Sequence, residues 1–264
     1  MNFRFTLSNP VRALFAREVR GALLNRYFQV FASLSLLGGL SAATLVEDGD
    51  ASAFFIMQIL LYFGSLFAVL IGVSTARAES EEWPLLFSQP VRRSAFALGK
   101  FAALATIFAL VLVPLFVPPL FVGAPAGRLA LLYLQSLGLA ACFGGLGLAA
   151  GFVARDRAQG LVFGASAWLL LLFGVDLVAL FAAHWPAWQR VPDLWVAGLM
   201  LNPLDAFRIQ ALFSMEQIPA EAAGKTPLAH WWLAHAGLWF ALLCGAWIAS
   251  MMTLASRRLE HWEE

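Results

Sequence analysis

The ionisable residues that could do chemistry within the apolar parts of this sequence are few and widely spaced. Asp176 is the only one clearly inside an apolar run, where a charged carboxylate costs about 2.5–3.5 kcal/mol on insertion scales. It therefore marks either a pathway or partner site, or a structural bond to a neighbouring helix or an outer arginine. Together with Ser166 and His184 it could also serve an intramembrane enzyme, which stays an alternative.

The other histidines do not have the spacing of a helical metal site. His230 and His235 are five residues apart and so face different sides of a helix, whereas helical zinc pairs need three or four. The sequence contains no HExxH, no GxSxG and no GxxxxGK[ST] phosphate-binding loop. We therefore expect no catalytic residue, no metal site and no bound cofactor in this chain.

A second group of polar residues lies in LNPLDAFRIQALF, residues 201–213. Asn202 is predicted to be a helix N-cap, Pro203 the first helical residue, and Asp205 the third position of a capping-box variant. Capping does not account for Arg208, which could pair with Asp205 at i, i+3 or reach a partner outside the membrane. We expect Asn202, Pro203, Asp205 and Arg208 to contact such a partner.

The overall composition places these residues in a membrane protein. The 264 residues are 61% hydrophobic and 12% charged, against roughly 45–50% and 25% for a soluble domain, and the mean hydropathy is +0.77. The net charge of +1 argues against a nucleic-acid binder. Cys142 and Cys244 lie in apolar runs and are expected to be buried thiols rather than part of a disulfide framework.

Six apolar stretches have the length that a membrane helix requires. The predicted spans are 27–46, 53–75, 101–122, 129–153, 160–182 and 236–255. The expected fold is therefore an all-α membrane protein with a single transmembrane domain over 1–264. The 53-residue segment 183–235 is too long for a bare connection and is predicted to be a helical periplasmic segment.

Lysine and arginine set the expected orientation of these spans. Thirteen of the 17 lysine and arginine residues lie in segments on the same side of the predicted spans as the two termini, and four lie in segments on the other side. The positive-inside rule therefore puts the N- and C-termini in the cytoplasm. Residues 8–26 repeat apolar side chains on one face, and they predict an amphipathic elbow helix, over 1–26, rather than a cleaved signal peptide. This helix is either a simple anchor or a moving part.

Small residues recur along the fourth predicted span. Ser136, Ala140 and Gly144 are spaced by four, and Gly147 and Gly151 form a GxxxG pattern. Small residues let membrane helices approach closely. They predict either packing within the chain or a dimer face.

The segment 77–100 is a long polar excursion between two spans. EEWPLLFS (81–88) predicts a short helix, QPVRR (89–93) a break, and Ser94 the cap of a second helix that runs into the third span. A short helix with apolar side chains and flanking charges could dock into a groove of a partner or rest on the lipid headgroups. The residue chemistry alone leaves both alternatives open.

The stretch RAESEEWPLLFSQPVRRSAFALGKFAA (77–103) resembles the cytoplasmic loop of ABC-2-type transporter permeases. AREVRGALLNRYF (16–28) is similar to the elbow helix of that family, whereas Trp83-Pro84 departs from the family pattern. The resemblance implies a permease whose cytoplasmic coupling loop contacts a separate ATPase subunit. The contact residues that it implies are Glu79, Glu81, Glu82, Leu85, Leu86, Gln89, Pro90, Arg92 and Arg93.

Two further stretches, AWLLLLFGVDLVALF (167–181) and 201–213, are similar to the NosY type of ABC-2 permease, which supports copper-site maturation of nitrous oxide reductase. This resemblance implies a homodimer in the bacterial inner membrane, in contact with membrane lipid. It also implies a NosF-like ATPase dimer that binds ATP and Mg, and a NosD-like periplasmic partner. Export of a sulfur species is the implied task, and a generic lipid or drug exporter is the alternative.

Overall fold

The structure is a computed structural model, and all regular structure in the part of the chain that it describes is helical. The described residues are 17, 19–21, 24–45, 49–78, 88, 93–182, 184, 191–215 and 226–260. No strand occurs in these ranges. The all-α prediction is confirmed for them.

In the part of the chain that the structure describes, six helices are long and apolar enough to cross a membrane, so the chain is a multi-pass membrane protein. The spanning elements are α2 (Arg26–Thr44), the continuous α3 (Gly49–Ile59), η1 (Leu60–Gly64) and α4 (Ser65–Arg77), then α6 (Arg93–Phe121), α7 (Ala126–Val153), α8 (Arg157–Ala182) and α13 (Ala236–Glu260). Each of the six predicted spans overlaps one of them. The sides on which the two termini lie remain a prediction.

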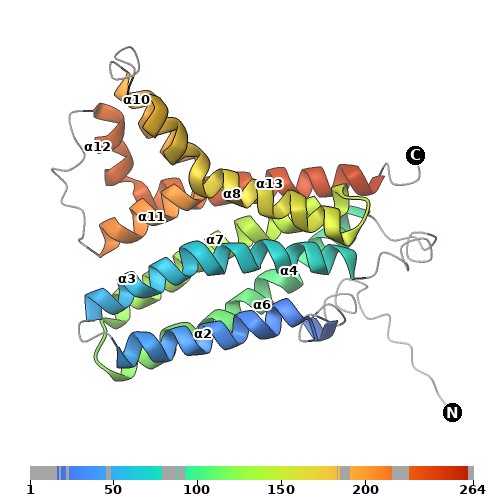
Figure 1. Cartoon of the computed structure of the whole chain (residues 1–264), viewed down its shortest axis with the longest axis horizontal. Coiled ribbons are helices and arrows are strands. Elements are labelled where there is room, and N and C mark those ends of the chain that lie inside the picture. Colours follow the sequence, from blue (N-terminus) through green and yellow to red (C-terminus); the bar gives the residue numbers. More distant parts are fainter. Residues whose placement is uncertain are drawn as a thin grey trace.

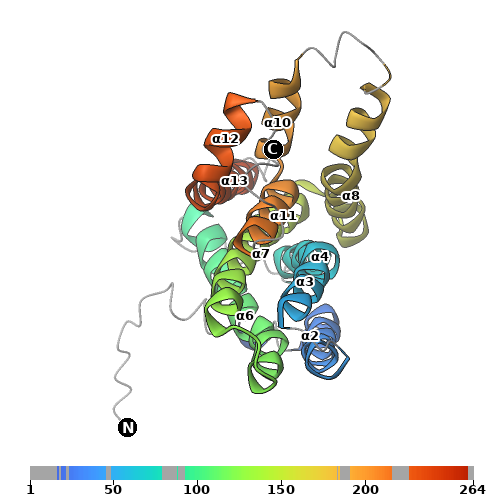
Figure 2. The same ribbon diagram turned by 90° about the vertical axis from the view of Figure 1, so that its left-hand side faces the viewer.

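The α4 and α7 helices form the centre of the bundle (Figures 1 and 2). The α7 helix packs against α4, α6, α8 and α13, while α2 packs mainly on α6. The outer surface of α8 is lined by exposed apolar side chains such as Leu170 and Phe181, as lipid contact requires. The buried core therefore centres on α4 and α7, with α2 and α8 at the edges.

The small residues of α7 explain how closely this centre is packed. A β-carbon on Gly151 would lie 2.5 Å from that of Ala76, and one on Gly147 would meet the carbonyl oxygen of Val69 well inside contact distance. In the other direction, a β-carbon on Gly72 of α4 would lie 2.5 Å from the carbonyl oxygen of Gly144. The GxxxG pattern therefore serves packing within the chain, which was one of its two predicted uses.

One turn of the second span is a π-helix, η1, which the sequence did not predict. Ser65 follows it directly, and its hydroxyl donates to the carbonyl oxygen of Leu61 at 2.5 Å. The indole Nε1 of Trp168 on α8 donates to the same hydroxyl at 2.8 Å. These bonds fasten the edge helix α8 to the wide turn at the middle of the second span.

The described residues of segment 183–235 form three short helices, α10 (Pro192–Leu201), α11 (Pro203–Ser214) and α12 (Pro227–Ala234). They lie at the end of the bundle that also holds the turn between α6 and α7 (Figure 1). The α11 helix packs against α7, α8 and α13. Two indoles of α13 hold the end of α10, because Trp239 donates to the carbonyl of Met200 at 2.8 Å and Trp247 to that of Leu201 at 3.3 Å. The helical prediction for this segment is thus confirmed in the described residues, and its periplasmic location stays a prediction.

Two predicted parts fall largely outside the described residues. Of the elbow helix predicted in 1–26, only Arg17 and 19–21 are described as helical, and α2 starts afterwards at Arg26. Asn25 caps α2, since its Oδ1 accepts from the backbone N–H of Tyr27 at 3.0 Å. In the predicted coupling loop, residues 79–87 and 89–92 lie outside the described ranges.

Candidate functional site

Asn202 connects α10 to α11 and is the centre of a buried polar cluster. Its Oδ1 accepts from the backbone N–H of Leu204 at 3.1 Å, which confirms the predicted N-cap with Pro203 as the first helical residue. Its Nδ2 donates at 2.6 Å both to the carbonyl oxygen of Leu171 on α8 and to Oδ2 of Asp205. The carboxamide therefore caps α11 and ties the first turn of that helix to the fifth span.

Asp205 is 3% exposed and accepts a bond from the Asn202 side chain. In a capping box it would instead accept from the backbone N–H of the N-cap residue. Burial raises the pKa of Asp205 to about 6, because water no longer stabilises its charge. The positive charge of Arg208 lowers the pKa of Asp205, the negative charge of Asp176 raises it, and the hydrogen bond from Asn202 lowers it.

Arg208 lies between the two carboxylates. Its Nη1 is 3.6 Å from Oδ1 of Asp205, the predicted i, i+3 pair, and 4.0 Å from Oδ2 of Asp176 on α8. The side chain of Asp176 is 54% exposed and that of Arg208 29%. At this distance and exposure, the Arg208–Asp176 pair is worth less than about 1 kcal/mol. Asp176 thus has the outer arginine that was one of its expected partners.

These four residues, Asp176, Asn202, Asp205 and Arg208, are called the outer cluster below. Within it Asn202 and Asp205, with the adjacent Pro203, are covered by residues of this chain, while Arg208 and Asp176 keep exposed surface. Contact of this region with a periplasmic partner stays a prediction. Of the four residues predicted to make that contact, Arg208 is the one that keeps exposed surface.

We predict that the outer cluster makes the stability of the protein depend on pH. Because the pKa of Asp205 is raised to about 6 in the folded protein, against about 3.9 in an unfolded chain, the folded state binds the proton more tightly. The contribution of Asp205 to the free energy of unfolding is therefore fully present below about pH 4 and is lost as the pH rises through about 6. This loss amounts to about 2–3 kcal/mol at most. Thermal unfolding in detergent between pH 4 and pH 7.5 measures this change.

The matched controls for this prediction are two amide substitutions. Asp205→Asn keeps an acceptor for Asn202 and should flatten the pH dependence. Asp193→Asn changes an exposed acid on α10 and should leave it intact. A wild-type profile that is as flat as that of Asp205→Asn would contradict the prediction.

At the other end of the bundle, Lys100 is completely buried inside α6. The third span was predicted to begin at 101, which left Lys100 just outside it on the helix leading into the span; this boundary was wrong, because the spanning helix α6 begins at Arg93 and contains Lys100. Its Nζ donates to the carbonyl oxygen of Thr75 at 3.1 Å and lies 5.1 Å from the ring centre of Phe96. Thr75 is in the last turn of α4, where free carbonyl groups attract a cation. They stabilise the buried ammonium group of Lys100.

Two arginines hold helix ends in the same way. Nε of Arg77 donates to the carbonyl oxygen of Gly151 in the last turn of α7 at 2.7 Å. Nη1 of Arg93 donates to the carbonyls of Leu259 and Glu260 at 2.7 and 2.6 Å, at the end of α13. Lys100, Arg77 and Arg93 thus join the C-terminal ends of α4, α7 and α13 to neighbouring helices. The sequence offered a signal for them in its uneven distribution of cations, which indicated orientation but not these bonds.

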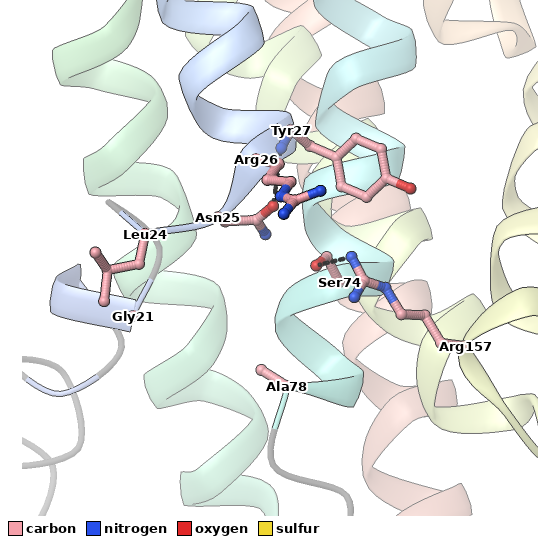
Figure 3. Close-up of a pocket in the computed structure, with 8 residues that line it drawn as sticks. All are labelled: Gly21, Leu24, Asn25, Arg26, Tyr27, Ser74, Ala78 and Arg157. Atoms are coloured by element: carbon pink, nitrogen blue, oxygen red, sulfur yellow. Dashed lines mark hydrogen bonds between the residues drawn. The ribbon is translucent and has the colours of Figure 1, made fainter.

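A cavity of about 590 Å³ lies at this same end, between α2, α4 and α8 (Figure 3). Nη2 of Arg157, at the start of α8, donates to the hydroxyl of Ser74 on α4 at 3.0 Å. Its guanidinium also lies 5.5 Å from the ring centre of Tyr27 on α2. The lining residues are Gly21, Leu24, Asn25, Arg26, Tyr27, Ser74, Ala78 and Arg157.

The residues considered for an intramembrane enzyme are not brought together. Ser166 and Asp176 both lie on α8, ten residues or about 15 Å apart along the helix, and His184 follows its end, with Nδ1 3.0 Å from the carbonyl oxygen of Leu180. His235 stacks on Trp231 at 5.1 Å between ring centres. Within the described ranges, no group of three or more His, Cys, Asp or Glu side chains could hold a metal ion.

Within the described ranges, the fold and these contacts define a helical membrane protein with six candidate spans and a group of polar contacts at each end of the bundle. No protein-family model matches the chain, and no curated protein is significantly similar to it.

Proposed function

We propose that this chain is the membrane-spanning subunit of an ABC-2-type transporter, which couples ATP hydrolysis by a separate ATPase subunit to movement of its helices. The observation that carries the proposal is the loop between α4 and α6, together with the way its two ends are attached. Residues 79–92 of this loop belong to the stretch that resembles the cytoplasmic loop of ABC-2-type permeases. It leaves α4 at Arg77 and enters α6 at Arg93, and these are the arginines that bind the ends of α7 and α13.

This attachment gives a route for mechanical coupling. A subunit that moves the loop would displace Arg77 and Arg93, and through their bonds the ends of α7 and α13. Lys100 stiffens the same region by joining α6 to the last turn of α4. Displacement of the loop would therefore reach four spanning helices within one or two turns of their ends, as a coupling segment requires.

The narrower proposal is a permease of the NosY type, working as a homodimer with a NosF-like ATPase dimer and a NosD-like periplasmic partner. It is supported by the two stretches that carry the resemblance, because they touch in the fold. Asn202 of the second stretch donates to the carbonyl of Leu171 in the first, and Arg208 lies 4.0 Å from Asp176. Export of a sulfur species in copper-site maturation belongs to this narrower proposal, and a generic lipid or drug exporter is the alternative.

The test of the proposed coupling is the double substitution Leu85→Asp with Leu86→Asp. If these leucines are buried in a groove of the ATPase, each loses about 1.5–3 kcal/mol of contact free energy. We expect at least a tenfold loss of ATPase recovered with the purified chain, and loss of stimulated ATP hydrolysis, while membrane insertion is unchanged. Co-purification with the ATPase subunit of the proposed transporter provides the measurement.

Arg155→Asp is the matched control for this test. Arg155 is exposed at the same end of the bundle, and replacing arginine with aspartate shifts the net charge by the same two units as the double variant without touching the loop. It should leave ATPase recovery unchanged. If the double variant also recovers the ATPase and stimulates hydrolysis like the wild type, the segment is only a connection and the proposed function fails.

A further inference from the structure

The cavity between α2, α4 and α8 brings together polar groups from three helices. The start of α2 contributes Asn25, Arg26 and Tyr27, the end of α4 contributes Ser74, and the start of α8 contributes Arg157. Figure 3 shows the guanidinium groups of Arg26 and Arg157 directed into the same space beside Ser74. The volume of about 590 Å³ is within the range of small-molecule sites.

The charges of this cavity are unbalanced. Arg157 is held by the hydroxyl of Ser74 and the ring of Tyr27, both of which are uncharged. Among the residues that the structure describes, no carboxylate forms an ion pair with Arg26 or Arg157. Two guanidinium groups that share a cavity repel each other, so an anion between them would be stabilised by both.

The donor groups of the cavity suit a phosphate. Arginine presents a planar fork of N–H groups that binds phosphate oxygens in pairs. The side-chain oxygen of Asn25 already caps α2, and its NH₂ group adds a donor at the rim of the cavity (Figure 3). These groups come from different helices, so the site depends on the tertiary fold and not on one helix terminus alone.

The position of the cavity indicates where such a phosphate would come from. The spanning helices α2, α4 and α8 begin or end at Arg26, Arg77 and Arg157, which places the cavity at the expected level of the lipid headgroups. Leu24 at the rim is 76% exposed and offers an apolar contact for a lipid chain. Basic pockets between membrane helices bind anionic headgroups elsewhere.

We propose that this cavity binds a phosphate group carried by an anionic phospholipid. The bound headgroup bridges Arg26 and Arg157 and thereby links the edge helices α2 and α8 across the end of α4. This inference is independent of the proposed ATPase coupling, because the site is complete in this chain and can be tested without an ATPase.

The experiment titrates the purified full chain in detergent with phosphatidylglycerol, phosphatidylcholine or inorganic phosphate, and follows thermal unfolding. We expect phosphatidylglycerol to stabilise the wild type and phosphatidylcholine to have little effect. Arg26→Gln and Arg157→Gln should each weaken the apparent affinity for phosphatidylglycerol about tenfold, as loss of one charge-assisted contact predicts, and the double variant should lose the response.

Arg155→Gln is the matched control, because Arg155 is exposed at the same end of the bundle and is not among the lining residues. It should keep the response of the wild type. Arg26→Lys and Arg157→Lys retain the charges if a glutamine variant fails to fold, and a partial loss of affinity is then expected. Native mass spectrometry of retained lipids gives a second readout.

Two results would overturn the proposal in different ways. Stabilisation by inorganic phosphate without any by phosphatidylglycerol would overturn the lipid source and leave a site for a soluble phosphate. A phosphatidylglycerol response that is equal in the wild type and in every arginine variant that folds, or absent from the wild type, would overturn the site itself.

Discussion

Leucine in place of Gly147 is expected to prevent the correct packing of α4 against α7. At this position even a β-carbon would collide with the carbonyl oxygen of Val69, and the obstacle is backbone, which cannot rotate away. Next to it, Gly151 is in similar contact with Ala76 and Val73. The two helices would have to separate along the centre of the bundle, which should cost more than about 3 kcal/mol.

Gly245→Leu is the matched control for this substitution. Gly245 also lies within a spanning helix, α13, but nothing lies within 4 Å of a β-carbon built there. We expect Gly245→Leu to be recovered from membranes like the wild type, and Gly147→Leu to aggregate or to unfold at a clearly lower temperature. Size-exclusion profiles and thermal unfolding in detergent give the comparison. Equal behaviour of the two leucine variants would mean that the α4–α7 contact is not as close as described.

The six spans could be predicted because apolar length is a local property of the sequence. The interactions that join the spans could not, since they connect residues far apart along the chain. Arg77 binds Gly151 and Arg93 binds Leu259, which are 74 and 166 residues away. A count of cations per segment shows on which side they gather, but it does not show which carbonyl each one reaches.

Lys100 shows the same limit at a single residue. Its charge led us to end the polar segment there and to begin the third span at 101. In the structure α6 starts at Arg93, and the first two turns carry Lys100 into the protein against α4. A lysine can enter the interior when its ammonium group contacts the carbonyl groups at a helix end. The residues around Lys100 do not indicate which helix end lies next to it.

In the outer cluster, the contacts between residues close in the sequence could be predicted, whereas the bond from Asn202 to α8 could not. The N-cap of Asn202 and the pair of Asp205 with Arg208 follow from spacings of two and three residues. The bond from Asn202 to Leu171 crosses 31 residues, and it accounts for asparagine at a position where a cap alone would accept serine or aspartate equally well.

Asn202→Asp is therefore expected to damage the fold although it preserves the cap. An aspartate at 202 can still accept from the N–H of Leu204, but it loses both donor bonds. Its oxygens would face the carbonyl oxygen of Leu171 and the carboxylate of Asp205 across contacts that are now 2.6 Å. A buried, unpaired negative charge of this kind should cost at least about 3 kcal/mol at neutral pH.

Low pH should restore part of the stability lost in Asn202→Asp. This recovery would show that the damage comes from repulsion between the carboxylates at 202 and 205 and not only from the lost hydrogen bonds. Protonation of one carboxyl supplies a donor between residues 202 and 205, and a site where burial already raises the pKa of Asp205 to about 6 takes up a proton readily. We expect Asn202→Asp to gain thermal stability in detergent between pH 7.5 and pH 5 more steeply than the wild type does. Asn202→Ser, which keeps an N-cap oxygen but adds no charge, should lose stability without gaining this steeper dependence on pH. If Asn202→Asp and Asn202→Ser were equally stable at both pH values, the carboxamide would act only as a cap and its bonds to Leu171 and Asp205 would not hold α11 to α8.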